Sequence, residues 1–177
     1  MEGLTVVGDV IAPDLRVLFC GINPGLMSEA TGHHFARPGN RFWPVLHLSG
    51  FTPCRLAPAE QEELLAYGLG ITNVVARPSA KASELSDEEF REGGVVLTEK
   101  VLRLRPRWLA VVGVTAYRVA FDDKHARIGR QERTIGDTHI WVLPNPSGLN
   151  AHWPLPKMTE EFERLRAASE AASEADG

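Results

Sequence analysis

Short apolar runs bounded by turn residues recur along the chain. Each run is rich in valine, isoleucine or aromatic residues, a composition that is typical of buried β-strands. Four such strands are predicted, at LRVLFCG (15–21), LGITNVV (69–75), WLAVVG (108–113) and HIWVLP (139–144).

Segments with helical patterns separate these runs. They are NRFWPVLHLSG from Asn40, APAEQEELLAYG from Ala57, SDEEFREGGVVLTEKVLRL from Ser86 and VTAYRVAF from Val114. Strands that alternate with helices favour parallel pairing, with helices on both faces of the sheet. The sequence therefore predicts an α/β fold, a three-layer α/β/α sandwich with a short, mostly parallel central sheet flanked by helices.

Polar segments mark the remaining parts of the chain. Residues 122–137 are charged and are expected to form a loop or hairpin before the last strand. Ser86 and Glu89 have the spacing of a capping box at a helix start.

The length of 177 residues fits one domain, which we place at residues 1–166. Residues 167–177 are small, acidic and polar, so we expect a disordered tail there.

The formal net charge of −4 does not exclude a nucleic-acid partner. Residues 157–177 hold three basic and six acidic side chains and so account for −3 of it. Local patches, rather than the net charge, then decide whether phosphates are bound.

Cys20 and Cys54 have no metal-site spacing, and no apolar run approaches the length of a membrane span. These features predict a soluble, cytoplasmic protein with no metal site.

Two Asn-Pro turns, GINPG after the first strand and NPSGLN (145–150) after the last, are the strongest chemical features. Ligands of parallel α/β sheets bind at the carboxyl ends of the strands, where both turns fall. Asn, Pro and Gly are also ordinary turn formers, so a purely structural role stays open. A serine hydrolase using Ser147 and His152 is disfavoured because the turn lacks the GxSxG pattern. The adjacent His33 and His34 are interpreted as loop residues.

Five ordered blocks together resemble the mismatch-specific uracil/thymine-DNA glycosylases of the uracil-DNA glycosylase superfamily. The blocks are GINPG, GHHFARPGNRFWPVL, GITNVVARPS, FREGG and IWVLPNPSGLN, and the resemblance runs from about Val10 to Asn150. It implies a monomeric, monofunctional enzyme that acts on double-stranded DNA, needs no metal and no cofactor, and is nucleoid-associated if bacterial. Such an enzyme flips uracil, thymine or a modified pyrimidine out of a mismatch and hydrolyses the N-glycosidic bond, leaving an abasic site.

The resemblance also assigns roles to individual residues. Asn23 would hold the attacking water, and Phe35 would stack on the flipped base. Ile22 would lie beside the base edge, and Asn145 would brace the pocket. Gly25 stands where strict uracil enzymes have a tyrosine, so it would leave room for a 5-methyl group.

The same resemblance predicts how DNA is held. Gly148, Leu149 and Asn150 would form the wedge loop, in which Leu149 enters the base stack while Gly148 and Asn150 face the orphaned partner base. Position 151 is alanine, where some relatives have a basic residue that contacts DNA. We therefore expect phosphate contacts elsewhere, with Arg37, Arg41, Arg77 and Lys81 as the candidates.

Two questions stay open at this level. An amide cannot take a proton as a carboxylate can, so Asn23 predicts modest catalysis unless an acid assists. Asp87, at a helix start where relatives tend to have lysine, is the candidate, although helix capping is the better explanation of an acid at this position. The alternative function is a mismatch-binding module of the same fold with little or no catalysis.

Overall fold

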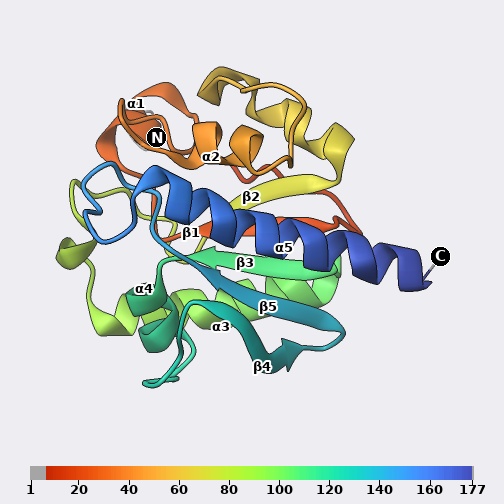
Figure 1. Ribbon diagram of the computed structural model, residues 1–177. Coiled ribbons are helices and arrows are strands. Elements are labelled where there is room, and N and C mark those ends of the chain that lie inside the picture. Colours follow the sequence, from red (N-terminus) through yellow and green to blue (C-terminus); the bar gives the residue numbers. More distant parts are fainter. Residues whose placement is uncertain (1–6, 177) are drawn as a thin grey trace.

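A five-stranded, mostly parallel sheet forms the centre of the molecule (Figure 1). The computed structural model describes residues 7–176. The strand order is β2-β1-β3-β5-β4, and only β4 runs antiparallel to its neighbour. The bounds are β1 Val17–Gly21, β2 Leu69–Asn73, β3 Trp108–Val112, β4 Gly129–Ile135 and β5 Thr138–Leu143. The predicted fold class and all four predicted strands are confirmed.

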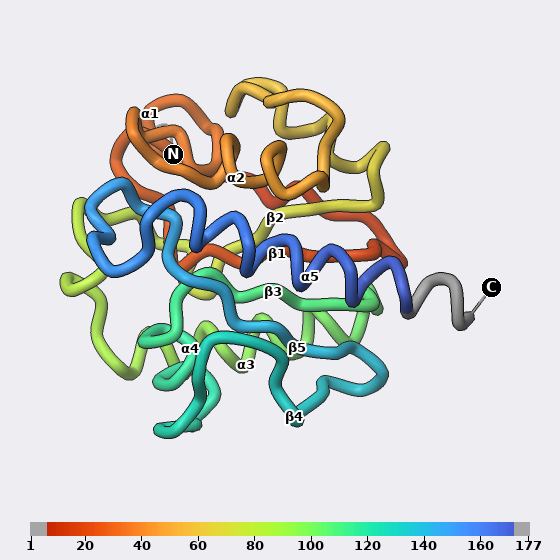
Figure 2. Tube along the Cα trace, in the orientation of Figure 1, coloured from red at the N-terminus to blue at the C-terminus, as the bar shows by residue number. Residues whose placement is uncertain are grey.

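Helices cover both faces of this sheet. They are α1 Leu26–Thr31, α2 Phe42–Leu48, α3 Asp87–Leu104, α4 Val114–Ala120 and α5 Leu155–Asp176, with two 3₁₀ helices, η1 Pro58–Tyr67 and η2 Ala82–Glu84. The segment predicted from Ala57 is thus a 3₁₀ helix, and α1 was not predicted. Figure 2 shows α5 crossing the front of the sheet from the loop after β5 towards the opposite end. None of the helices in the described range combines the length and apolar character that a membrane crossing requires.

Alternation along β1 explains the two hydrophobic layers. Val17 and Phe19 belong to the layer that also holds α2 and α5, whereas Leu18 and Cys20 belong to the layer of α3 and α4. Successive side chains of a strand point to opposite faces, so a strand buried on both sides needs an unbroken apolar run. This is why the four parallel strands could be recognised from apolar runs alone.

The register brings the carboxyl ends of the parallel strands to one edge of the sheet. Gly21 lies opposite Asn73, and Val112 lies opposite Leu143. The turns that follow β1, β2, β3 and β5 therefore meet at this edge. This edge lies on the left of Figure 1.

The predicted capping box at the start of α3 is confirmed. Ser86 Oγ accepts from the Glu89 backbone N–H, and Glu89 Oε1 accepts from the Ser86 N–H, both at 3.1 Å. Residues 122–137 contain β4, which forms the hairpin that was one of the two predicted alternatives.

The prediction of a disordered tail is wrong for residues 167–171, which continue α5. Arg166 Nη1 pairs with Glu170 Oε2 at 3.0 Å, one helical turn further on. Ser169 is buried, and Ala168 packs against the apolar layer beneath α5. The small side chains of Ala168 and Ser169 therefore take part in the packing of α5.

Two glycines set how closely α3 packs. A Cβ on Gly94 would lie 2.3 Å from the Ala120 carbonyl oxygen, and one on Gly93 would lie 2.2 Å from that of Val74. Both neighbours are backbone atoms, which cannot move aside as the end of a flexible side chain could. The GG pair of the FREGG block therefore has a packing function.

We expect Gly94→Ala to lower the free energy of unfolding by about 1–3 kcal/mol. The forced separation of α3 from α4 outweighs the gain of about 1 kcal/mol that alanine has over glycine within a helix. Urea denaturation measures the change, with Val96→Ala at a 56% exposed position of the same helix as the control. Equal stability of Gly94→Ala and wild type would contradict the close packing.

Candidate active site

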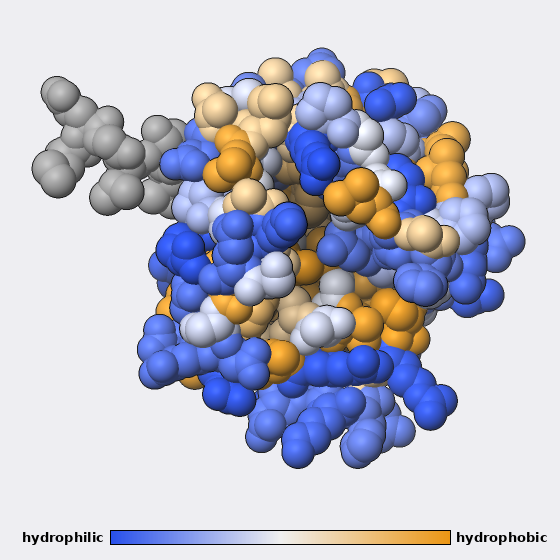
Figure 3. Space-filling model, turned by 90° about the vertical axis from the view of Figure 1, so that its left-hand side faces the viewer, coloured by the Kyte–Doolittle hydropathy of each residue, from blue (hydrophilic) through white to orange (hydrophobic). Residues whose placement is uncertain are grey.

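A cavity of about 780 Å³ opens at the carboxyl edge of the sheet. Its walls come from the turn after β1, the loop between α1 and α2, the loop after β2 and the turn after β5. Figure 3 looks at this end of the molecule and shows apolar side chains inside a largely polar rim. The structure thus brings both Asn-Pro turns to one cavity, as the sequence predicted.

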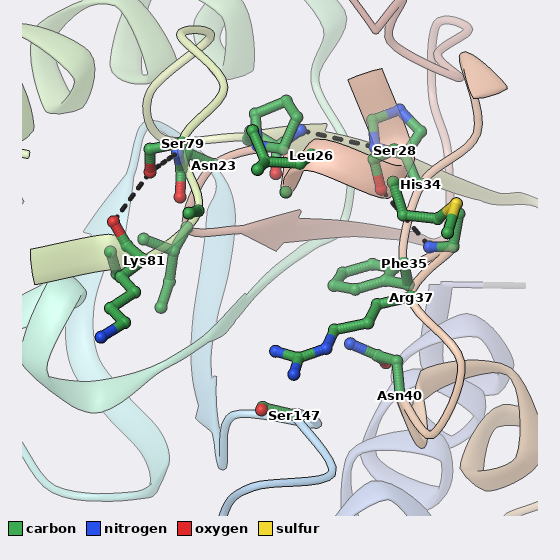
Figure 4. Close-up of a pocket in the computed structure, with 18 of the residues that line it drawn as sticks. Asn23, Leu26, Ser28, His34, Phe35, Arg37, Asn40, Ser79, Lys81 and Ser147 are labelled. Atoms are coloured by element: carbon green, nitrogen blue, oxygen red, sulfur yellow. Dashed lines mark hydrogen bonds between the residues drawn. The ribbon is translucent and has the colours of Figure 1, made fainter. Parts of the chain in front are cut away.

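The side-chain amide of Asn23 is held in one orientation. Its Nδ2 donates to the Arg77 carbonyl oxygen at 2.9 Å and to Ser79 Oγ at 2.8 Å. Ser79 Oγ in turn donates to the Lys81 carbonyl oxygen at 2.8 Å. Both amide hydrogens are therefore used (Figure 4), whereas Oδ1 accepts no hydrogen bond from the described residues. An amide oxygen can only accept, so this group suits binding and orienting a water molecule.

Phe35 presents one ring face to the cavity. Its other face stacks on Phe42, with the ring centroids 4.1 Å apart and an interplanar angle of 22°. The backbone of Phe35 has a φ of +52°, a conformation that is costly outside glycine and is often found at functional sites. The neighbouring His34 fixes the segment, because its N–H donates to Gln61 Oε1 and its carbonyl accepts from Trp43 Nε1.

The remaining predicted base-binding residues, Ile22, Gly25 and Asn145, also line the cavity. No heavy atom lies within 4 Å of a Cβ built on Gly25, so a side chain there would enter open space. Asn145 Oδ1 accepts from the Ser147 N–H at 3.0 Å, which places Asn145 as a brace of its own turn. All five residues predicted around the base, these three with Asn23 and Phe35, are brought together.

The turn that holds Gly148, Leu149 and Asn150 projects Leu149 outwards. This side chain is 74% exposed, although leucine is usually buried. A Cβ on Gly148 would lie 2.5 Å from the Gly39 carbonyl oxygen, so the turn packs directly on the loop before α2. Ser147 Oγ accepts from the Leu149 N–H, a turn contact rather than part of a nucleophile pair.

Arg41 stabilises this turn from beneath. Its Nη2 donates to the carbonyl oxygens of Ser147 and Asn150, at 2.8 and 3.1 Å, and its Nη1 donates to that of Trp153. The side chain is only partly exposed. The structure therefore gives Arg41 a loop-bracing function and leaves few of its donors for DNA phosphates.

The other three predicted cations differ in whether they form an ion pair within the protein. Arg77 forms a two-point bond with Glu89, at 2.8 and 3.0 Å, and this bond lowers the pKa of the Glu89 carboxyl to about 2. Arg37 and Lys81 are exposed on different walls of the cavity (Figure 4). Neither has an ion pair within the described residues. These two are the better candidates for phosphate contacts.

Asp87 is not brought to the cavity. It is the exposed first residue of α3, where a carboxylate is favoured by the helix dipole, and it does not line the cavity wall. The structure therefore does not place a carboxylate of this helix start beside Asn23.

Sequence reasoning missed three residues that line the same cavity. Ser79 anchors Asn23, and Asn73 ends β2 with its amide beside the cavity. His34 is buried, and its Nδ1 lies 3.4 Å from Asn73 Nδ2. A polar residue at the carboxyl end of a buried strand was the one available signal for Asn73.

The side chains predicted or found to act in the cavity provide amide groups, a hydroxyl group and an aromatic ring face. Within residues 7–176, no three His, Cys, Asp or Glu side chains are grouped so as to hold a metal ion. Cys20 is fully buried, and burial raises the pKa of its thiol far above the ordinary range, so it is chemically quiet. The cavity suits binding a planar, polar ring and positioning a water against it.

Comparison with known proteins gives two findings. Residues 9–168 match the sequence profile of the family described as the uracil DNA glycosylase superfamily. Among solved structures, the chain resembles a solution NMR structure from Methanosarcina acetivorans whose assignment as a uracil DNA glycosylase is provisional. The TM-score is 0.62 and the identity 20%, over 91% of this chain and 97% of that one. The structural likeness supports the fold, and the profile match covers both Asn-Pro turns.

Proposed function

Because the chain belongs to the uracil-DNA glycosylase superfamily, we propose that it removes uracil, or thymine, from mismatched double-stranded DNA and leaves an abasic site. The observation that carries this proposal is the orientation of Asn23. Its two N–H groups are tied to Arg77 and Ser79, so its oxygen is the group left for a water in a cavity walled by Phe35.

The reaction follows from these groups. A water held by Asn23 Oδ1 attacks C1′ of the flipped nucleotide, and the C1′–N1 bond breaks with its electron pair leaving on the base. The proton that the water loses passes to bulk solvent, and solvent in turn protonates the released base anion. The departing pyrimidine anion spreads its charge over two carbonyls, so hydrogen-bond donors near it can stabilise it without a general acid. Because an amide does not accept the proton, catalysis is expected to be slower than with a carboxylate base.

Selection of the base rests on three features of the cavity. The free face of Phe35 stacks on the ring, a contact worth about 1–3 kcal/mol per base. The open space at Gly25 accommodates a 5-methyl group, which supports thymine as a second substrate. Asn73 offers a donor and an acceptor to the base edge.

Preference for mismatches follows from the energy of flipping. Extruding a nucleotide takes a few kcal/mol and takes least where pairing is already weak. The cavity rim offers only Arg37 and Lys81 as unpaired cations among the four predicted, so little binding energy is available to open a well-paired duplex.

A substrate panel tests the mismatch preference. Single-turnover rates on duplexes that differ only in G·U, G·T or A·U at one site are expected to be highest for G·U and lower for A·U. Equal rates for G·U and A·U would overturn the mismatch part of the proposal and leave the glycosylase part standing.

We expect Ser79→Ala to lower the single-turnover rate on G·U about fivefold, since the Asn23 amide loses one of its two anchors and one hydrogen bond of about 1 kcal/mol. Binding to the duplex, measured by fluorescence anisotropy, is expected to stay the same. Ser79→Thr keeps the hydroxyl and serves as the control. A rate for Ser79→Ala equal to that of wild type would contradict the anchoring role.

A further inference from the structure

The ring of His34 lies between a backbone carbonyl and the amide of Asn73. Its Nε2 is 2.8 Å from the Gly8 carbonyl oxygen, and its Nδ1 is 3.4 Å from Asn73 Nδ2. The ring is buried, and the main chain of His34 is bonded to Gln61 and Trp43 on either side. The ring is therefore fixed in place at the wall of the cavity.

These contacts define the tautomer of His34. A carbonyl oxygen can only accept, so Nε2 carries the proton that is donated to Gly8. In the neutral ring Nδ1 is then bare and can only accept. Asn73 must present an N–H to it, which fixes one of the two possible orientations of its amide.

We propose that His34 is a positioning residue that holds the Asn73 amide in one orientation and thereby makes the cavity prefer uracil or thymine to cytosine. This inference rests on the proposed function, because it assumes that a pyrimidine occupies the cavity. Within the described residues, the second N–H of Asn73 and its Oδ1 have no other hydrogen bond, so both are available to the base.

The chemistry of the base edge explains the preference. Uracil and thymine offer an acceptor at O4 and a donor at N3–H, whereas cytosine offers a donor at its amino group and an acceptor at N3. A primary amide matches one pattern in one orientation and the other pattern after a half-turn about its terminal bond. Freedom to turn would let Asn73 satisfy both bases, and His34 removes that freedom.

The same geometry predicts an effect of acidity. Protonation of Nδ1 would place an N–H against an N–H and reverse the amide. Burial lowers the pKa of His34, outweighing the opposing effects of the Gly8 carbonyl and of the carboxylates of Asp9 and Glu62, while His33 acts in the same direction as burial. The ring is thus neutral at neutral pH, and selectivity is expected to be lost only as the solution becomes acidic.

Two substitutions separate positioning from simple anchoring. In His34→Asn a side-chain oxygen can replace Nδ1 and accept from Asn73, but the reach to Gly8 is lost. In His34→Gln the side-chain N–H₂ can replace Nε2 and donate to Gly8, but the acceptor towards Asn73 is lost. Isothermal calorimetry with free uracil and free cytosine measures the preference of each purified variant without any need for base excision.

The proposal expects the uracil-to-cytosine preference to fall about tenfold in His34→Gln, the effect of one misplaced hydrogen bond, and to persist in His34→Asn. In acid, the uracil-to-cytosine preference is expected to decline in wild type and to remain in His34→Asn. The reverse order of the two variants, or an equal preference in both, would overturn it. Nitrogen-15 chemical shifts of the His34 ring in wild type report which ring nitrogen carries the proton, so a neutral ring protonated at Nδ1 would also overturn it, even if both variants fail to fold.

Failure of this inference can be told apart from failure of the proposed function. If wild type releases uracil from a G·U duplex but the variants show no such difference, the inference about His34 is wrong and the glycosylase assignment stands. If free bases bind with the expected preference but no duplex loses its uracil, the assignment of catalysis is the part that fails.

Discussion

Replacing Asn23 with alanine is expected to lower the single-turnover rate of uracil release from a G·U duplex by about 10²–10⁴-fold. The reason is geometric: Asn23 Oδ1 is the acceptor left free by the bonds to Arg77 and Ser79, and alanine has no group to hold a water there. The rate is measured with enzyme in excess, by cleaving the abasic product with alkali and separating the strands.

Duplex binding provides the control for this variant. Asn23 is only partly exposed and lies inside the cavity rather than on the DNA-facing rim, so binding of the G·U duplex is expected to change little. Melting temperatures of both proteins establish that the variant is folded. A rate within a few-fold of wild type would show that the water is held elsewhere and would remove the catalytic role of Asn23.

Leu149→Ala is expected to lower the rate on G·U by about 10- to 100-fold, because the gap left by the flipped base is no longer filled by an apolar wedge. The side chain is 74% exposed, so its removal leaves no cavity in the core. The melting temperature should therefore stay the same. The loss should be much smaller on single-stranded DNA, where no stacked duplex has to be opened.

Leu102→Ala is the matched control for the wedge. Leu102 is 53% exposed and lies near the C-terminal end of α3, outside the cavity wall. This control is expected to leave the rates on both substrates unchanged. An equal loss for Leu149→Ala on single strands and on duplexes would contradict a function in base flipping.

The parallel strands were predictable from sequence because they are buried on both faces, which forces unbroken apolar runs such as those at residues 17–20 and 108–112. The sequence of residues 122–137 does not distinguish a loop from a hairpin, because the exposed edge strand there carries mainly polar side chains. The helical residues 167–171 were missed for a different reason. Their packing depends on contacts with elements distant in the sequence, and local composition does not contain this information.

The cavity was predictable only in part. Asn23 and Phe35 were reached through a resemblance, and the structure now gives the reasons for their positions: two anchors for the amide, and one covered ring face. The sequence could not distinguish Arg41 and Arg77 from Arg37. An arginine that braces a loop or pairs with a carboxylate looks the same in sequence as one that is available to bind phosphate.

The pairing of His34 with Asn73 was beyond sequence reasoning altogether. The two residues lie 39 positions apart and meet only because the carboxyl end of β2 and the loop before α2 share a wall of the cavity. Each residue alone has an ordinary explanation, one as a loop histidine and the other as the end of a strand. Their relationship depends on hydrogen-bond donors and acceptors that only the three-dimensional arrangement defines.

Detection of the released base is a direct test of glycosylase activity. Wild-type protein is incubated in excess with a duplex that contains one G·U pair, and mass spectrometry follows both the free base and the intact strand. We expect free uracil together with a strand that has lost one base but keeps its backbone. A duplex that is bound, as judged by gel shift, yet retains its uracil would contradict this expectation and would identify the protein as a mismatch-binding module.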